Sequence, residues 1–522
     1  MPAQHTRRAV LGASLAVAGT GVLAACAGRG DTPDHSAMDH GAPSGTAAPE
    51  GYVSPGGPEV AAAEKRRGAG PERKVALTAT ASRLDLGGGR TVSSWAYGDR
   101  LPGQEIRVTA GDTLALTLAN HLPQATSLHW HGLALRNDMD GVPGLTQRAV
   151  EPGAGFAYRF AVPDPGTYWV HPHSGVQLDR GLYAPLIVED PKEPLSYDKE
   201  WVVVLDDWLD GVDGSTPDAV LRELTGGSGH SGHAMPAPSS SGDGGPSRML
   251  MGATSELLGG DAGDVGYPYY LVNGRTPQDP SAFTARPGDR IRLRIINAGG
   301  DTAFRIALGG HRMTVTHTDG FPVRHTATDA LLLGMGERYD VLVTAGDGVF
   351  PLTALAEGKD ATALALLRTG SGAAPGAAVR PKELDGELVT ADRLVPDRSV
   401  ALSGRTPDRT VRIRLTGSMA AYDWAFDGKP YTADQRHPVQ AGERVRIEFR
   451  NTTAMWHPVH LHGHTFALAG SASGARKDTA IVLPRQTLTV DLDADNPGLW
   501  MLHCHNLYHA EAGMMTVLGY RR

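Results

Sequence analysis

The chain is short of cysteine, of clustered positive charge and of long apolar runs, and each shortage excludes a class of protein. Only 2 of its 522 residues are cysteine, so we expect no fold held by structural disulfides. The net charge is −8 and no basic block occurs, which argues against nucleic-acid binding. The chain is rich instead in turn-forming residues, with 66 glycines and 36 prolines, which suit an all-β protein. Its length exceeds that of one core, so we expect two or three domains.

The apolar run near the start, residues 9–25, is too short and too weakly apolar for a permanent membrane span. It follows the pair Arg7 and Arg8, which resembles a twin-arginine export signal. The sequence Leu-Ala-Ala-Cys that ends at Cys26 resembles a bacterial lipobox. We therefore predict a signal peptide over residues 1–26 and an exported lipoprotein, held at the outer face of the cytoplasmic membrane by lipid on Cys26. The alternative is an ordinary signal peptide cut nearby.

Two stretches have the composition of flexible chain. Residues 27–73 are rich in glycine, proline, alanine and charge and show no hydrophobic period, which predicts a disordered tether. Residues 210–260 are dominated by glycine, serine and proline and predict a mobile, solvated loop. This loop carries imidazole and thioether side chains, which suit Cu(I). They belong to His230, His233, Met235, Met249 and Met251.

A ten-residue pattern that begins with glycine and ends with asparagine occurs three times, at residues 111–120, 288–297 and 442–451. Each copy is a turn followed by strict apolar alternation, which is typical of a half-buried strand. The copies are too far apart for a solenoid. They indicate three homologous β domains, near residues 74–195, 196–380 and 395–522.

A second repeat links only the first and third domains. Residues 165–173 align without a gap on residues 497–505, and residues 129–132 align on 460–463. Four histidines of the first domain therefore have four counterparts in the third. Because residues i and i+2 of a strand share a face, each His-x-His offers two rings to one side. Eight imidazoles are too many for one metal ion but suit three.

The C-terminal segment adds a different ligand set. Cys504 lies between His503 and His505, and His509 and Met514 follow. A cysteine, a histidine and a weak axial methionine form a blue-copper electron-transfer centre. On a strand, the two flanking histidines point away from the cysteine, so the sulfur has a short covalent path to whatever they bind. In the first domain the positions aligned with Cys504 and His457 are Pro172 and Thr126, so only the third domain keeps this centre.

These four motifs, in this order along the chain, resemble those of the multicopper oxidase family. The resemblance covers roughly residues 74–522, and the C-terminal segment is most similar to the bacterial copper-resistance branch. It implies an all-β fold of three cupredoxin-like Greek-key β-sandwiches and four copper ions. The implied ligands are His457, Cys504, His509 and Met514 for type 1 copper, His129 and His460 for type 2, and His131, His171, His173, His462, His503 and His505 for the type 3 pair.

The resemblance also implies the reaction, in which a substrate is oxidised one electron at a time and O2 is reduced by four electrons to water. Cys504 would carry the electrons, and nearby acids would supply protons. Asp140 matches a family acid, although Asp140-Gly141 also reads as a turn. Many relatives place an acid directly after the type 1 histidine, where this chain has Ala510 and then Glu511. The proton route is therefore left open.

Three functions fit these features. The leading hypothesis is an oxidase of Cu(I) that serves copper tolerance, since Met455 stands where some cuprous oxidases carry a substrate-binding methionine. The alternative for Met455 is core packing. A laccase-like oxidase of small phenols and aromatic amines is the second hypothesis. A copper-storage protein without turnover is the third, and the complete type 1 set argues against it.

Overall fold

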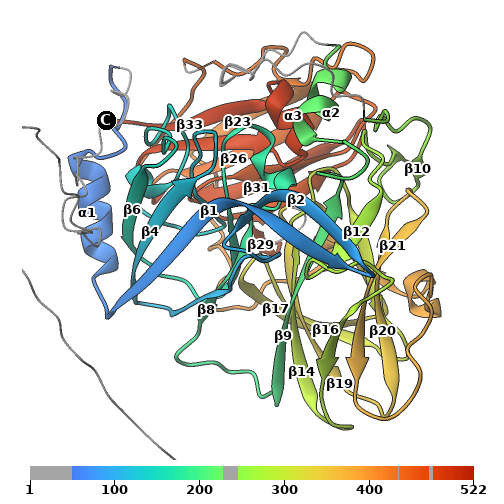
Figure 1. The fold of residues 1–522 in the computed structure, drawn as a ribbon. Helices are drawn as coiled ribbons and strands as arrows, with labels where there is room; N and C mark the ends of the chain where they lie inside the picture. The colour runs from blue at the N-terminus through green and yellow to red at the C-terminus, as the bar shows by residue number, and fades with distance from the viewer. Residues whose placement is uncertain (1–49, 227–244, 433, 470–473) are drawn as a thin grey trace, which may run out of the picture. The chain divides into compact units, whose positions relative to one another are not determined.

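The computed structural model describes residues 50–226, 245–432, 434–469 and 474–522. Cys26 and the rest of the predicted signal peptide lie outside these residues, as do His230, His233 and Met235. The described strands form three β-sandwiches in chain order (Figure 1), which confirms the predicted fold class. None of the described helices is long and apolar enough to cross a membrane.

Domain 1 consists of a sheet of order β2-β1-β4-β6 and a sheet of order β3-β8-β7-β5. Its strands are β1 (Glu72–Gly87), β2 (Arg90–Tyr97), β3 (Ile106–Thr109), β4 (Thr113–His121), β5 (His129–His131), β6 (Gly155–Ala161), β7 (Gly166–His171) and β8 (Ala184–Glu189). Helix α1 (Pro58–Arg67) precedes them, and the 3-10 helices η2 (Asn137–Met139) and η3 (Gly175–Arg180) lie between them.

Domain 2 has sheets of order β12-β9-β14-β19-β16-β17 and β13-β21-β20-β15-β18-β22. Its strands are β9 (Lys199–Trp208), β12 (Tyr269–Val272), β13 (Ser281–Thr284), β14 (Arg290–Asn297), β15 (Phe304–Leu308), β16 (Met313–Thr318), β17 (Phe321–Thr328), β18 (Ala330–Leu333), β19 (Arg338–Thr344), β20 (Val349–Ala356), β21 (Ala361–Arg368) and β22 (Leu388–Val389). The shorter elements are α2 (Pro217–Leu224), β10 (Thr254–Ser255), β11 (Gly260–Asp261), η4 (Lys382–Asp385) and η5 (Ala391–Arg393).

Domain 3 has sheets of order β24-β23-β26-β31-β28-β29 and β25-β33-β32-β27-β30. Its elements are β23 (Arg409–Thr416), β24 (Ala425–Phe426), β25 (His437–Gln440), β26 (Arg444–Asn451), β27 (His457–Leu461), β28 (Phe466–Leu468), β29 (Arg476–Lys477), β30 (Thr479–Val482), β31 (Thr487–Asp493), β32 (Leu499–Cys504), α3 (Leu507–Ala512) and β33 (Met515–Arg521).

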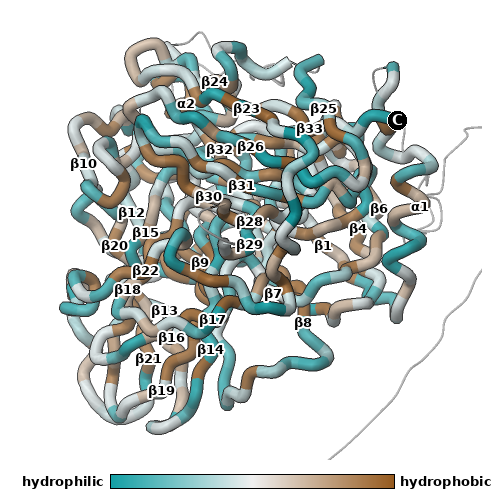
Figure 2. The backbone as a smooth tube through the Cα atoms, turned by 180° about the vertical axis from the view of Figure 1, so that it is seen from behind, coloured by the Kyte–Doolittle hydropathy of each residue, from teal (hydrophilic) through white to brown (hydrophobic). Residues whose placement is uncertain are grey.

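The ten-residue repeat forms the same strand in each domain, namely β4, β14 and β26. Each copy pairs in parallel with the first strand of its domain and antiparallel with a later one. The asparagine that ends each copy (Asn120, Asn297 or Asn451) accepts the amide two residues on and donates to a carbonyl of the following loop. The apolar stretches of such strands are brown in Figure 2. The repeat therefore encodes one strand and one turn, used three times.

The predicted disordered tether, residues 27–73, is wrong for the part that the structure describes. Helix α1 carries proline in its first turn and buries Val60 and Ala63. Its signal in the sequence was a run of good helix formers directly after Pro58.

Contacts with two domains explain why α1 is ordered. The Glu64 carboxylate accepts the amide of Ala161 in β6, and the Arg67 guanidinium donates to Asn496 at 2.8 Å. Ahead of the helix, the Val53 amide donates to Tyr520 of β33 at 2.8 Å. Helix α1 therefore joins domain 1 to domain 3.

The predicted mobile loop, residues 210–260, is likewise wrong at both of its described ends. Residues 217–224 form helix α2, whose N-cap Thr216 accepts the amide of Ala219. On the other side, Leu250 donates its amide to Asp264 at 2.8 Å, so this segment runs along the chain that leads into β12.

Candidate metal centres

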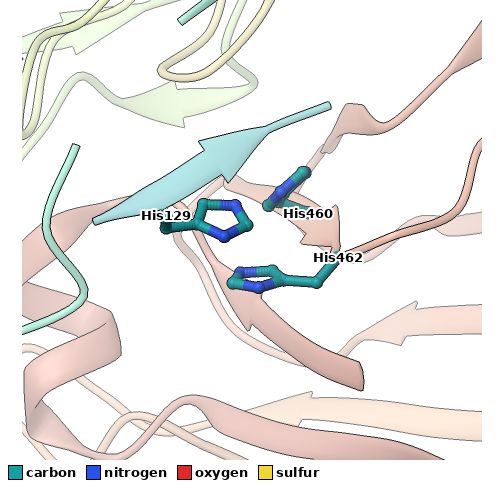
Figure 3. Close-up of side chains that lie close together, drawn as sticks. All are labelled: His129, His460 and His462. Carbon is teal, nitrogen blue, oxygen red and sulfur yellow. The ribbon is translucent and has the colours of Figure 1, made fainter. Parts of the chain in front are cut away.

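Eight histidine rings meet between domain 1 and domain 3. They are His129, His131, His171 and His173 of domain 1 and His460, His462, His503 and His505 of domain 3. The ring centroids of His129 and His462 are 3.7 Å apart, and those of His131 and His460 are 3.8 Å apart. Both pairs cross the domain boundary, and Figure 3 shows His129 beside His460 and His462. His173 joins the cluster at 4.9 Å from His503. We call these rings the eight-histidine cluster.

Short strand pairs set the positions of these rings. His129 lies opposite His171 in the β5–β7 register, and His460 lies opposite His503 in the β27–β32 register. The alternation of strand side chains then brings His131 and His462 to the same side as their neighbours two residues earlier. Domain 3 thus repeats the arrangement of domain 1, and the cluster exists only where the two halves face each other.

In most of these rings one nitrogen is held by an oxygen and the other faces the cluster. Nδ1 of His129, His171 and His460 lies 2.9, 3.0 and 2.9 Å from a backbone carbonyl oxygen. Within the described part of the chain, the buried Nε2 of each of the three has no hydrogen-bond partner. The same is true of Nδ1 of His131 and of both ring nitrogens of His505. Unpaired buried nitrogens are unfavourable unless a metal ion accepts their lone pairs, so the residues fit metal binding.

The protonation state of the rings agrees with this fit. Burial, and then the proximity of other imidazoles, lowers the pKa of most cluster histidines well below the ordinary value. This holds for His131, His171, His462, His503 and His505. The rings are therefore neutral, which is the form that binds a metal.

A second centre lies in domain 3, where Cys504 Sγ is 3.7 Å from Nδ1 of both His457 and His509, and the two nitrogens are 3.0 Å apart. Asn506 caps α3 by accepting the amides of Tyr508 and His509, which fixes the second ring. The Met514 amide donates to the His509 carbonyl at 3.0 Å, and its carbonyl accepts the Cys504 amide at 3.0 Å. All four predicted type 1 residues are therefore brought together and buried.

One strand joins the two centres. His503 and His505 belong to the eight-histidine cluster, and Cys504 between them belongs to the second centre. The arrangement agrees with the alternation expected from the sequence. An electron on the Cys504 sulfur therefore reaches the cluster through the covalent backbone of one residue.

Sequence reasoning missed one acid beside the second centre, Asp264 of domain 2. Its Oδ2 lies 2.8 Å from His509 Nε2 and accepts the Tyr422 hydroxyl at 2.8 Å. Burial opposes protonation, but the charge of Asp264 raises the pKa of His509 to about 10. Trp424 covers the pair, with its ring centroid 4.5 Å from His509. No local motif marks Asp264, because its contact with His509 joins different domains.

Asp140 and Asp478 lie against the eight-histidine cluster. Asp140 Oδ2 is 3.0 Å from His462 Nδ1, and its backbone carbonyl holds His129. Asp140-Gly141 also forms the turn that the sequence allowed, since Gly141 has φ 83°. Asp478, which sequence reasoning missed, places Oδ1 3.1 Å from His131 Nε2.

Glu511 lines a small cavity of about 20 Å³ beside the cluster, which is room for one water molecule. The other lining residues include His173, His503 and Cys504. Burial raises the pKa of Glu511 to about 7. The predicted acid therefore shares a cavity with residues of both centres.

Met455 does not lie where its predicted role requires. Its side chain is 2 % exposed and packs in the apolar core, so the structure contradicts the prediction of an accessible substrate ligand. Its carbonyl accepts the Asn451 side chain at 2.7 Å, which is part of the repeated turn. Among the described methionines, Met249 and Met251 are the exposed ones, at 40 % and 73 %.

Three sandwiches with a cysteine-containing centre and a histidine cluster define a copper protein of the cupredoxin class. Multicopper oxidase profiles match residues 78–193, 200–372 and 404–521. The chain is 50 % identical over 456 residues to multicopper oxidase MmcO of Mycobacterium tuberculosis, covering 85 % of this chain and 86 % of that protein. It is 30 % identical to a copper resistance protein A homologue of Pseudomonas syringae pv. tomato, covering 79 % and 87 %. A crystal structure of a multi-copper oxidase from Pseudomonas thermotolerans superposes with a TM-score of 0.64 at 27 % identity, covering 86 % of this chain and 99 % of that one.

The chain therefore belongs to the multicopper oxidase family. It is an oxidoreductase that uses O2 and carries four copper ions.

Proposed function

We propose that the two centres bind copper with the ligands that the sequence predicts. His457, Cys504, His509 and Met514 hold type 1 copper, and the eight-histidine cluster holds the other three ions. His129 and His460 take the type 2 ion, and the remaining six rings take the type 3 pair. The unpaired ring nitrogens, the neutral rings and the 3.7 Å contacts of Cys504 Sγ support this assignment. Bound copper supplies one-electron oxidation at the first centre and O2 reduction at the cluster.

We further propose Cu(I) as the substrate and copper tolerance as the role. The observation that carries this proposal is the route from type 1 copper to the surface. His457 and His509 are both 0 % exposed, so a bulky phenol cannot rest on their ring edges. Asp264 hydrogen-bonds to His509, and its carbonyl accepts the amide of Leu250.

The two exposed methionines flank Leu250 in the sequence, and Met249 also forms a β-bridge with Val265, the residue after Asp264. Thioether sulfur prefers Cu(I), whereas Cu(II) prefers nitrogen and oxygen ligands, so this segment favours the reduced ion and releases the oxidised one. An electron from Cu(I) would then pass through Asp264 to His509. A relative named for copper resistance agrees with this role.

The test compares two substrates in the copper-loaded enzyme. We expect the double variant Met249→Leu, Met251→Leu to lower kcat/KM for Cu(I) several-fold and to leave oxidation of a substituted phenol unchanged. Met455→Leu is the matched control, since this methionine is buried and its replacement should change both rates alike. Equal loss of both rates in the double variant, or a wild-type enzyme much faster with phenol, would favour the laccase-like alternative.

For location we propose attachment to the outer face of the cytoplasmic membrane through lipid on Cys26. Single acyl chains bind membranes weakly, whereas the diacylglycerol of a lipoprotein is sufficient. Cys26→Ser should release soluble protein or stall its processing. Mass spectrometry that finds unmodified protein cleaved elsewhere would disprove the anchor.

A further inference from the structure

Domain 2 supplies none of the eight cluster histidines, yet three of its residues contact the cluster or the residues that hold its rings. Asp319 lies in the β16–β17 connection, Gly336 lies in the β18–β19 connection, and Arg338 begins β19. Arg338 and Asp319, both 0 % exposed, bond to the domain 3 segment 477–479, and Gly336 lies against two rings of the cluster.

These contacts centre on Arg338. Its Nη1 and Nη2 each donate to one oxygen of Asp478 at 2.7 Å, in the two-pronged geometry that fixes a carboxylate in its plane. Its Nε donates to the backbone carbonyl of Thr167 at 3.0 Å, in the strand that carries His171. One guanidinium of domain 2 therefore binds both domains that build the cluster.

Asp478, held in this orientation, hydrogen-bonds to two rings of the cluster. Its Oδ1 accepts from His131 Nε2 at 3.1 Å, and its carbonyl accepts from His460 Nδ1 at 2.9 Å. His131 is thereby held in the tautomer that leaves Nδ1 free, whereas His129, His171 and His460 leave Nε2 free. Thr479 Oγ1 lies 3.1 Å from His131 Nε2 and donates to Asp478 Oδ1, so rotation of Asp478 would disturb both partners of that nitrogen.

Asp319 reinforces the same segment from behind. Its Oδ1 accepts the Arg338 amide at 2.9 Å, and its Oδ2 accepts the amides of Asp478 and Thr479 at 3.1 and 3.2 Å. The Lys477 ammonium lies between Asp319 and Glu337, at 3.1 and 3.0 Å. Every charge in this contact is buried and paired, so its geometry is strongly constrained.

Two glycines show how close the approach is. Gly336 has φ 86°, and a Cβ there would lie 2.9 Å from His131 and 3.0 Å from His505. A Cβ on Gly132 would collide with Arg338 Nη2 and with Asp478 Oδ2. The backbone of domain 2 therefore touches the cluster rings directly.

We infer that Arg338 is a positioning residue for the copper cluster, and that the ligand-free middle domain uses it to fix the metal-binding nitrogen of His131. This inference rests on the proposed ligand assignment. We call the bonds from Arg338 to Asp478 and Thr167 the clamp. Its loss should weaken copper binding in the cluster and spare type 1 copper, since Arg338 contacts none of the type 1 ligands among the residues that the structure describes.

The test compares Arg338→Lys with Arg292→Lys in the purified, copper-loaded full chain. Arg292 is a buried guanidinium of the same domain that pairs with Asp340 and Glu193 and, among the described residues, makes no bond to Asp478. We expect Arg338→Lys to weaken copper retention in the cluster by about 10- to 100-fold and to alter the type 2 electron paramagnetic resonance signal. The blue type 1 absorbance should persist, and Arg292→Lys should keep all its copper.

A third variant, His131→Ala, separates the two hypotheses. If it retains full cluster copper, the ligand assignment fails and the clamp falls with it. If it loses copper while Arg338→Lys keeps a normal copper content and type 2 signal, the assignment stands and the clamp is refuted. Should Arg338→Lys not accumulate, Asp319→Asn, which loosens the same segment, is judged by the same criteria.

Discussion

At the scale of single residues, the chemistry depends on which atom each side chain leaves free. Backbone carbonyls occupy one nitrogen of His129, His171 and His460 and direct the other toward the cluster. Cys504 is buried within reach of two imidazoles, so its sulfur faces these rings and cannot act as a surface thiol.

Cys504→Ser should abolish the blue absorbance and the turnover of every substrate. The change removes the thiolate ligand and the electron path together, while the eight histidines remain intact. Copper analysis should therefore show that the cluster ions are retained. Oxidase activity in a variant with its full copper content would contradict the ligand assignment.

Glu511→Gln should slow the enzyme by about 100-fold at saturating substrate, because it removes the acid that lines the cavity beside the cluster. Cu(I) and phenol oxidation should slow by the same factor, since protons are needed only when O2 is reduced. The blue absorbance should stay unchanged and serves as the control for copper loading. An unchanged kcat would exclude Glu511 as the proton donor.

At the scale of elements, short segments do more than their length suggests. Strand β5 has 3 residues and β32 has 6, yet together they carry three of the cluster histidines and Cys504. Helix α1 is also short, but its 10 residues bond to β6 of domain 1 and to Asn496 of domain 3. Asn496 in turn donates to the carbonyls of Leu135 and Gly463, on either side of the interface that forms the cluster.

Val60→Asp should detach α1 and lower the free energy of unfolding by about 2 kcal/mol, the burial energy of one valine. Trypsin should then cut after the basic residues of its last turn, Lys65, Arg66 and Arg67, which the wild type protects. Ala61→Asp is the control, since Ala61 is exposed on the same helix. Equal protease resistance in the two variants would show that the helix contributes little.

At the scale of the whole molecule, a buried ion-pair network of domain 2 also contacts domain 1. Asp340 of β19 accepts the Thr167 hydroxyl of domain 1 at 2.7 Å and pairs with Arg292 and Arg294 at 2.6 and 3.1 Å. Burial favours its neutral form, but the two guanidinium groups prevail and lower the pKa of Asp340 to about 2. Ionised Asp340 therefore stabilises the folded protein at every pH above the pKa that this carboxyl has in the unfolded chain.

Asp340→Asn should destabilise the protein at pH 7 by on the order of 2 kcal/mol. Because the folded pKa lies below the unfolded value of 3.8, this contribution is complete above about pH 4 and disappears as the pH falls through about 2. Unfolding curves of the two proteins should therefore converge across that window. Asp213→Asn, a change at a side chain that is 74 % exposed, should show no such convergence. A pH-independent difference for Asp340→Asn would disprove the linkage.

The sequence by itself determined the three sandwiches, because strand alternation depends only on near neighbours. The set of copper ligands was predicted from the resemblance of the histidine and cysteine motifs to those of multicopper oxidases. The same local view failed at α1, where docking against two domains orders a segment that reads as a tether.

Only the tertiary structure decided which side chains surround the copper ligands. His131 and Asp478 are 347 residues apart, and Asp264 reaches His509 across 245 residues. Such contacts form because separate domains pack together, and no periodicity within one segment encodes them. Met455 shows the converse: its place two residues before His457 predicted a substrate-binding methionine, but the packing of domain 3 buries it, while Met249 and Met251 lie at the surface.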